Sequence, residues 1–232
     1  MWCCAGFDKA VKCKFLLGPG RSGTSFFSKW LASHEDHELM FDPPILHRLL
    51  SLYGEVDNKT ISDLINLYIY RDGLEAKTIG RSINMRKSDL SYSLAYKTPG
   101  SIQKKFEITD FTASSICVKV TDAVFKLSEL KKEFPNFSFL LVVRHPDDVI
   151  RSIKEKGWFS QYRFNENLSV STLVWKNYNG FRVPHWLPLS NYDEWLNLSD
   201  TDRAAFYYTC ALKLALENKR ILKVLNLSLI HI

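Results

Sequence analysis

The segment from Phe15 to Ser25, FLLGPGRSGTS, combines glycines, hydroxyl side chains and one arginine in the spacing of an anion-binding turn. An apolar run ends at Gly18, and a helical pattern begins beyond Gly23. Glycines let a backbone turn tightly and approach a ligand, and the unpaired N–H groups of a helix start attract an anion. The segment therefore predicts a strand, a phosphate-binding turn and a helix, with a phosphorylated ligand.

A nucleoside-triphosphate loop, G-x-x-x-x-G-K-[ST], is an alternative interpretation of the same residues. Gly18, Gly23 and Ser25 fit that spacing. However, the lysine position holds Thr24, and the nearest cation is Arg21, earlier in the turn. A P-loop kinase or NTPase would lack its phosphate-bridging lysine. It stays an alternative, as do a non-catalytic phosphonucleotide-binding module and an ordinary βα turn.

A second segment, FSFLLVVRHPDDVIRSIKEKG at residues 137–157, has the pattern of another strand followed by a helix. The continuous apolar run at 139–143 is typical of a strand buried on both faces of a parallel sheet. Pro146 suits the first helical position, and Gly157 can end the helix. Arg144 at the strand end and Ser152 on the helix could then bind a second phosphate. A surface helix with charged ends is the other interpretation.

The two segments together resemble the sulfotransferases that use 3′-phosphoadenosine-5′-phosphosulfate (PAPS). GPGRSGTSFF at 18–27 resembles their 5′-phosphosulfate loop, and RHPDDVIRS at 144–152 is similar to their 3′-phosphate motif. Residues 119–143 resemble the run that connects the two motifs in this family, and the similarity extends from residue 12 to 158, more faintly to 220. The resemblance implies an α/β fold in three layers, α/β/α, around a central mainly parallel sheet, the P-loop NTPase-like sulfotransferase fold. It also implies sulfuryl transfer to an acceptor hydroxyl or amine.

The resemblance further implies a donor site with two parts. The 5′-phosphosulfate would be bound by Gly20, Arg21, Ser22, Gly23, Thr24 and Ser25, and the 3′-phosphate by Arg144 and Ser152. Phe26 would lie against the adenine ring, although a phenylalanine at a helix start can equally belong to the core. Members acting on carbohydrates often have arginine where this chain has Arg21, which favours a glycan or another hydroxylated acceptor.

Asp42 is the predicted catalytic base. It follows a predicted strand at 38–41, and ligands of open α/β sheets bind beyond the carboxyl ends of the strands. Many family members carry a glutamate before a proline at this place, whereas an aspartate there could also cap the following helix. Lys119, at another predicted strand end, would neutralise developing charge together with Arg21. His47 is a weaker base candidate, and Lys97 would belong to the acceptor side.

Composition restricts the remaining possibilities. With 232 residues, 46% of them hydrophobic, the chain can form one large α/β core. The net charge of +6 favours anionic partners, but the sequence has no nucleic-acid recognition pattern. The five cysteines form no C-x-x-C pair, and the cluster at residues 34–38 lacks the H-E-x-x-H spacing, so no metal is expected. We expect no membrane span and a cytoplasmic location; the oligomeric state is left open.

The other segments give coarser predictions. Residues 58–73 predict an amphipathic helix capped by Thr60 or Ser62, and residues 46–96 would supply the acceptor pocket. Residues 158–195 are predicted to be irregular, as in a lid, and 200–224 a long helix capped by Ser199 or Asp200. We expect one sulfotransferase domain at 1–226 whose C-terminal part is missing, and we interpret residues 227–232 as a sequencing-adapter artefact.

Overall fold

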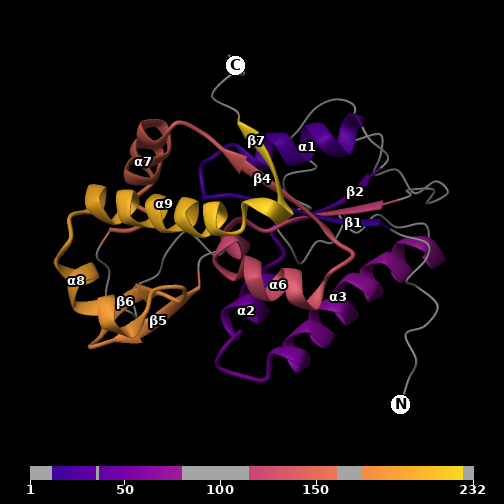
Figure 1. The fold of residues 1–232 in the computed structure, drawn as a ribbon, viewed down its shortest axis with the longest axis horizontal. Helices are drawn as coiled ribbons and strands as arrows, with labels where there is room; N and C mark the ends of the chain where they lie inside the picture. Colours follow the sequence, from indigo (N-terminus) through magenta and orange to yellow (C-terminus); the bar gives the residue numbers. More distant parts are fainter. Residues whose placement is uncertain (1–11, 35–36, 80–114, 161–173, 227–232) are drawn as a thin grey trace.

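A parallel sheet lies at the centre of the molecule (Figure 1). The structure is a computed structural model of the chain, and it describes residues 12–34, 37–79, 115–160 and 174–226. The sheet contains β1 (Lys12–Leu17), β2 (His37–Phe41), β3 (Ser115–Lys119), β4 (Ser138–Val143) and β7 (Leu222–Asn226). The strand order is β2-β3-β1-β4-β7, and every neighbouring pair is parallel.

Helices cover both faces of this sheet because successive side chains of its buried strands point to opposite sides. Phe15 and Leu17 of β1 pack with side chains of α2 (Pro44–Ser51), α3 (Asn58–Ile79) and α6 (Leu127–Glu133). Leu16, between them in sequence, packs with Leu31 of α1 (Thr24–His34) on the other face. The chain is therefore a three-layer α/β/α protein with a parallel sheet, as predicted.

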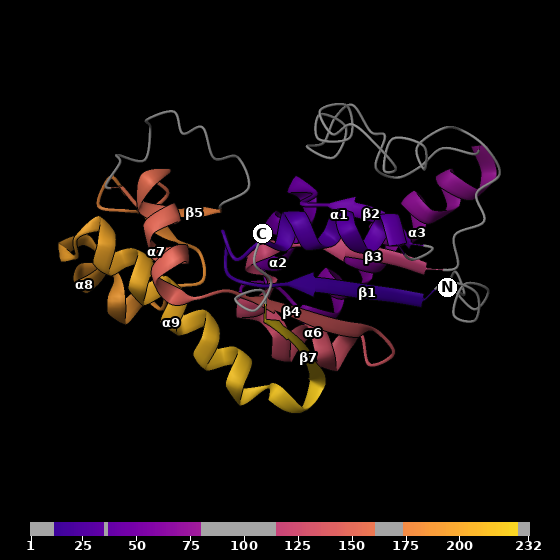
Figure 2. The same cartoon turned by 90° about the horizontal axis from the view of Figure 1, so that it is seen from above.

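A second hydrophobic cluster lies beyond one end of the sheet. It is built from α7 (Pro146–Glu155), the antiparallel hairpin β5 (Trp175–Tyr178) and β6 (Phe181–Pro184), α8 (Tyr192–Asn197) and α9 (Asp200–Glu217). Short 3₁₀ turns precede α6, α8 and β7 at Thr121–Lys126, Leu189–Asn191 and Lys219–Ile221. In Figure 2, β1 points toward this second cluster. The carboxyl ends of the strands thus face it.

Helix α9 belongs to both clusters. Ala204 and Tyr207 lie in the second cluster, whereas Ala211 and Ala215 pack against the sheet side. Ser199 caps the helix, since the Asp202 N–H donates to its hydroxyl over 3.2 Å. The cap prediction is thus confirmed, and the helix fixes the position of the second cluster relative to the sheet.

Three predictions about element boundaries are wrong. The helix predicted to run to residue 224 ends at Glu217, and β7 then pairs with β4, whose backbone edge would otherwise be unpaired. The segment predicted as irregular at 158–195 contains the β5–β6 hairpin and α8. Helix α3 begins at Asn58, but neither predicted residue caps it, since Asp57 accepts the Thr60 N–H over 2.8 Å, and it continues to Ile79 instead of ending at residue 73.

Candidate active site

The residues predicted to act on a ligand gather at the carboxyl edge of the sheet. The turn at 18–23 follows β1, Asp42 follows β2, Lys119 ends β3 and Arg144 follows β4. The connection after β1 leads to β2 on one side of it, whereas the connection after β4 leads to β7 on the other side. Ligands of open α/β sheets bind where neighbouring connections diverge in this way. The turn, Asp42, Lys119 and Arg144 thus share one edge of the sheet.

The turn after β1 is tightly packed. The Ser22 N–H donates to the Pro19 carbonyl over 3.2 Å, and Arg21 has a positive φ of 69°. A Cβ atom at Gly18 would overlap the Val142 carbonyl oxygen, and it would lie 3.0 Å from the Thr24 methyl group. Thr24 is buried against Gly18, so the position of the P-loop lysine is filled here by a packing residue.

The turn retains groups suited to an anion. The Ser22 hydroxyl is fully buried and has no hydrogen-bond partner among the residues that the structure describes. Helix α1 begins at Thr24, so its first N–H groups have no intrahelical acceptor. Their direction and the helix dipole both favour a negative charge. Phe26 is 48% exposed and therefore does not belong to the core.

The two predicted donor motifs meet in the structure. Arg21 Nε donates to Ser152 Oγ over 3.0 Å, and the Arg21 guanidinium lies 5.9 Å from the centre of the Trp158 ring. Arg144 is partly exposed, with its Nε 3.3 Å from Asp148 Oδ2, and the Tyr208 hydroxyl donates to its carbonyl oxygen over 2.5 Å. The helix that follows Arg144 thus contacts the turn after β1 through Ser152.

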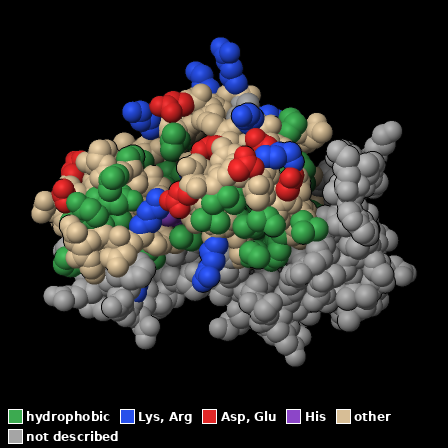
Figure 3. Space-filling view, turned by 90° about the horizontal axis from the view of Figure 1, so that it is seen from below, with side chains coloured by type: hydrophobic (Ala, Val, Ile, Leu, Met, Phe, Trp, Pro, Cys, Tyr) green, Lys and Arg blue, Asp and Glu red, His purple; other side chains and the backbone are tan. Residues whose placement is uncertain are grey.

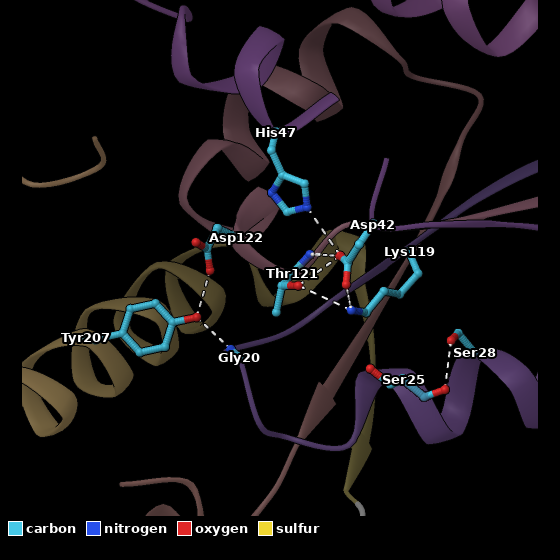
Figure 4. A network of polar contacts seen from close by, with 9 residues as sticks. All are labelled: Gly20, Ser25, Ser28, Asp42, His47, Lys119, Thr121, Asp122 and Tyr207. Atoms are coloured by element: carbon cyan, nitrogen blue, oxygen red, sulfur yellow. Dashed lines mark hydrogen bonds and ion pairs between the residues drawn. The ribbon is translucent and has the colours of Figure 1, made fainter. Parts of the chain in front are cut away.

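A second polar group surrounds Asp42 (Figure 4). The Lys119 ammonium forms an ion pair with Asp42 Oδ2 and lies 4.5 Å from the centre of the Phe41 ring. The Thr121 hydroxyl donates to Asp42 Oδ1 over 3.0 Å, and His47 Nε2 lies 3.3 Å from the same oxygen. Asp42 and Lys119, predicted from separate strand ends, are therefore in direct contact.

The charge state of Asp42 follows from these neighbours. Burial alone would raise the pKa of the Asp42 carboxyl, but the Lys119 ammonium and the His47 hydrogen bond outweigh it. The pKa is held well below its usual range, so the carboxylate stays ionised. Asp42 caps no helix, because the N-cap of α2 is Pro43, without a side-chain cap bond. Its backbone is unusual, with a φ of 41°.

Sequence reasoning missed Tyr207 and Asp122. The Gly20 N–H donates to the Tyr207 hydroxyl oxygen over 2.6 Å, and the Tyr207 hydroxyl donates to Asp122 Oδ1 over 2.7 Å. Tyr207 lies within the predicted long helix, where no spacing marks it. Asp122 lies three positions after Lys119, within the connecting run at 119–143, and this proximity to a predicted site residue could have indicated it.

Sequence reasoning also missed His185, at the end of the hairpin. Its side chain is buried, and within the described part of the chain its Nδ1 atom has no hydrogen-bond partner. Burial, reinforced by the positive charges of Lys126 and Lys176, lowers the pKa of His185 to about 3. An ion pair between Lys176 and Glu55 joins the hairpin to the segment after α2. His185 is therefore neutral, and it lies within electrostatic range of His47.

The remaining predictions have mixed outcomes. Lys97 and residues 80–96 of the predicted acceptor pocket lie outside the described residues, whereas 46–79 form most of α2 and all of α3. Of the cluster at 34–38, residues 35 and 36 are also outside them. The described residues contain no group of three or more side chains suited to a metal. None of the described helices is both long and apolar enough to span a bilayer.

The face of the molecule in Figure 3 carries side chains of several types. Lys and Arg side chains are interspersed there with acidic and hydrophobic ones. Among the described residues in that view, no continuous basic patch is present.

The fold and the site define an α/β protein with a glycine-rich turn between the central strand of a parallel sheet and a helix. A family model described as "Sulfotransferase family" matches residues 15–186. The match spans most of the chain, including both predicted motifs, and the chain belongs to the sulfotransferase family. No curated protein has a significant match to the chain.

A solved structure also resembles the chain. The sulfotransferase domain from the curacin biosynthetic pathway is 14% identical, with a TM-score of 0.44. The alignment covers 94% of this chain and 67% of that domain.

Proposed function

We propose that the chain transfers a sulfuryl group from PAPS to a hydroxyl, or an amine, of an acceptor, with a carbohydrate as the favoured acceptor class. The observation that supports this donor is the contact between Arg21 and Ser152, 3.0 Å long, which joins the two motifs expected to bind its two phosphate ends. Membership of the sulfotransferase family supports the type of reaction.

The turn fits the phosphosulfate end of the donor. Arg21, the unpaired Ser22 hydroxyl and the N–H groups of Gly23, Thr24 and Ser25 would bind it. When bound, PAPS supplies an activated sulfuryl group whose departing phosphate gains negative charge. Arg21 and the N–H groups would stabilise that charge, and one such donor typically lowers the barrier by about 3–4 kcal/mol. Gly20 contributes differently, since its N–H is already bonded to Tyr207.

The 3′-phosphate would be bound by Arg144 and Ser152. Arg144 now pairs with Asp148, but both side chains are partly exposed, at 44% and 33%. Such a pair contributes only about 0–1 kcal/mol, so a phosphate can compete for the guanidinium. Phe26, exposed at the start of α1, is available to the adenine ring. No step of this assignment requires a metal.

Asp42 and His47 are the proposed base. Asp42 alone is a weak base, because its pKa is held low by Lys119. Bonded to His47 Nε2, it can orient the imidazole and stabilise the imidazolium formed when His47 takes the acceptor proton. Lys119 keeps Asp42 ionised and balances its charge. Asp42 follows β2 and Arg144 follows β4, with β3 and β1 between these two strands in the sheet.

A kinase-like function has less support, since Thr24 is buried in the position where a P-loop lysine would reach the phosphates. Calorimetry with 3′-phosphoadenosine-5′-phosphate (PAP), the desulfated product, and with ATP separates the two. Binding of ATP in preference to PAP would contradict the proposal.

Labelled PAPS offered with a panel of glycans, lipids and phenols tests the transfer itself. We expect labelled product with at least one glycan. PAP binding without transfer to any acceptor would instead indicate a non-catalytic binding module.

A further inference from the structure

Tyr207 and Asp122 connect the donor turn to the protein interior through two hydrogen bonds in series (Figure 4). The Gly20 N–H donates to the Tyr207 oxygen over 2.6 Å, and the Tyr207 hydroxyl donates to Asp122 over 2.7 Å. Tyr207 is fully buried, and Asp122 is 4% exposed. Residues 20 and 207 are 187 positions apart in sequence.

Packing alone does not account for this pair. The Tyr207 ring packs against Phe125, Phe159 and Trp186, contacts that a phenylalanine ring would also make. Burial of a carboxylate is costly unless hydrogen bonds compensate it, and burial raises the pKa of Asp122. The polar pair therefore costs free energy that an apolar pair would not.

Gly20 is tightly enclosed at the same point. A Cβ atom there would overlap the indole ring of Trp158, so the turn is closed on one side by that ring. On the other side, its N–H is held by Tyr207. Both contacts restrict the residue that directly precedes Arg21, which is the cation of the turn.

We infer that Tyr207 and Asp122 are positioning residues that hold Gly20, and with it Arg21 and the N–H groups of the turn, in the geometry that receives the donor. This inference rests on the proposed function. It assigns the Gly20 N–H to the anchoring of the turn instead of to the ligand. Neither side chain is proposed to touch the reacting atoms.

The segment at residues 119–122 also positions the proposed base. Lys119 and Thr121 contact Asp42, while Asp122, the next residue, holds the donor turn through Tyr207. Residues 119–122, at the end of β3 and the start of the 3₁₀ turn, thus set the distance between base and donor turn. A displacement of Asp122 would therefore move the donor turn relative to the base.

Tyr207→Phe tests this inference, with Tyr53→Phe as the matched control. Tyr53 is also buried and bonds one hydroxyl, that of Ser62, over 2.8 Å, away from the turn. We expect Tyr207→Phe to weaken PAP binding about tenfold in calorimetry. We also expect faster hydrogen exchange at residues 18–25, whereas Tyr53→Phe changes neither.

Asp122→Asn, alone and combined with Tyr207→Phe in a double variant, tests whether Asp122 and Tyr207 act as a unit. The double variant should weaken PAP binding no more than Tyr207→Phe alone. A fall in melting temperature with unchanged PAP affinity and unchanged exchange at the turn would show a merely structural contribution and overturn the inference. If Asp122→Asn fails to fold, the PAP affinity and the hydrogen exchange of Tyr207→Phe still test the inference.

Failure of the proposed function gives a different result. If the wild-type chain binds no PAP, the donor assignment is wrong. The exchange rates of residues 18–25, measured without ligand, still report whether Tyr207 holds the turn. Unchanged exchange in Tyr207→Phe would then overturn the inference independently.

Discussion

Arg21 Nε and Ser152 Oγ form a hydrogen bond of 3.0 Å between residues that are 131 positions apart in sequence. One belongs to the turn after β1, and the other lies on α7, after β4. Because β1 and β4 are neighbouring parallel strands, the segments after them emerge side by side. Two motifs that would bind opposite ends of one nucleotide are thereby held at a fixed separation.

Arg21→Ala should lower kcat by about 10²–10³, since one preorganised donor to the departing phosphate is lost. Arg21→Lys keeps the charge but loses the planar donor geometry, so we expect an intermediate loss. Steady-state kinetics with labelled PAPS measures both. Lys132→Ala, an exposed cation on α6, is the control and should be unchanged. Equal activity of Arg21→Ala and this control would refute the assignment.

Asp148→Asn should strengthen PAP binding up to about fivefold, because the Asp148 carboxylate competes with the 3′-phosphate for Arg144. Arg144→Ala should weaken binding. Calorimetry with PAP measures both affinities. The control is Asp147→Asn, whose side chain is 84% exposed and contacts His145 instead. Weaker binding by Asp148→Asn would show that this carboxylate supports the site.

Asp42→Asn and His47→Gln should each lower kcat by about 10²–10⁴, because they disable a general base. Asp42→Asn should also destabilise the fold by about 3–5 kcal/mol, since it leaves the buried Lys119 charge without its partner. Kinetics and urea unfolding separate the two effects. Full activity in His47→Gln together with loss in Asp42→Asn would assign the proton transfer to Asp42 itself.

His185 should make the fold less stable in mild acid. Its pKa is about 3 in the folded chain, below the usual 6.5, so the unfolded chain binds a proton that the folded chain does not. The stability is present above pH 6.5 and is lost as the pH falls from there toward 3, by about 1.4 kcal/mol per pH unit.

His185→Gln should therefore show a flatter pH profile than the wild type in urea unfolding. A range from about pH 6.5 down to 4.5 avoids the titration of Asp42, whose contribution is lost only below the usual carboxyl range. His145→Gln, with an exposed histidine, is the control. Parallel profiles for His185→Gln and the wild type would mean that His185 titrates normally.

The sequence predicted those parts of the site that follow from local patterns. The strand, turn and helix from β1 to α1, and again from β4 to α7, each show an apolar run followed by a helix start. The carboxyl ends of parallel strands lie at the same edge of a sheet, so the predicted strand ends correctly grouped Asp42, Lys119 and Arg144 at one edge. These positions depend only on neighbours in sequence and on parallel pairing.

The rest depends on distant contacts. Tyr207 reaches Gly20 because α9 packs against both the sheet side and the second cluster, which no periodicity indicates. The residues of β7 continue a helical pattern in sequence, yet they pair with β4 because its edge needs hydrogen-bond partners. His185 is buried by the hairpin fold, and its neutral state follows from that burial.

The strand order has a consequence for how the protein folds. Lys12 of β1 pairs with Ser115, and Phe139 of β4 with Leu222, so neighbouring strands come from distant parts of the chain. Pairings of this kind slow folding, because the entropy of closing long loops is lost before the strand contacts can offset it. We expect the central strands to remain unpaired during synthesis until their later partner strands are made, and their exposed apolar side chains can then aggregate. Yield should then improve when synthesis is slowed or chaperones are supplied.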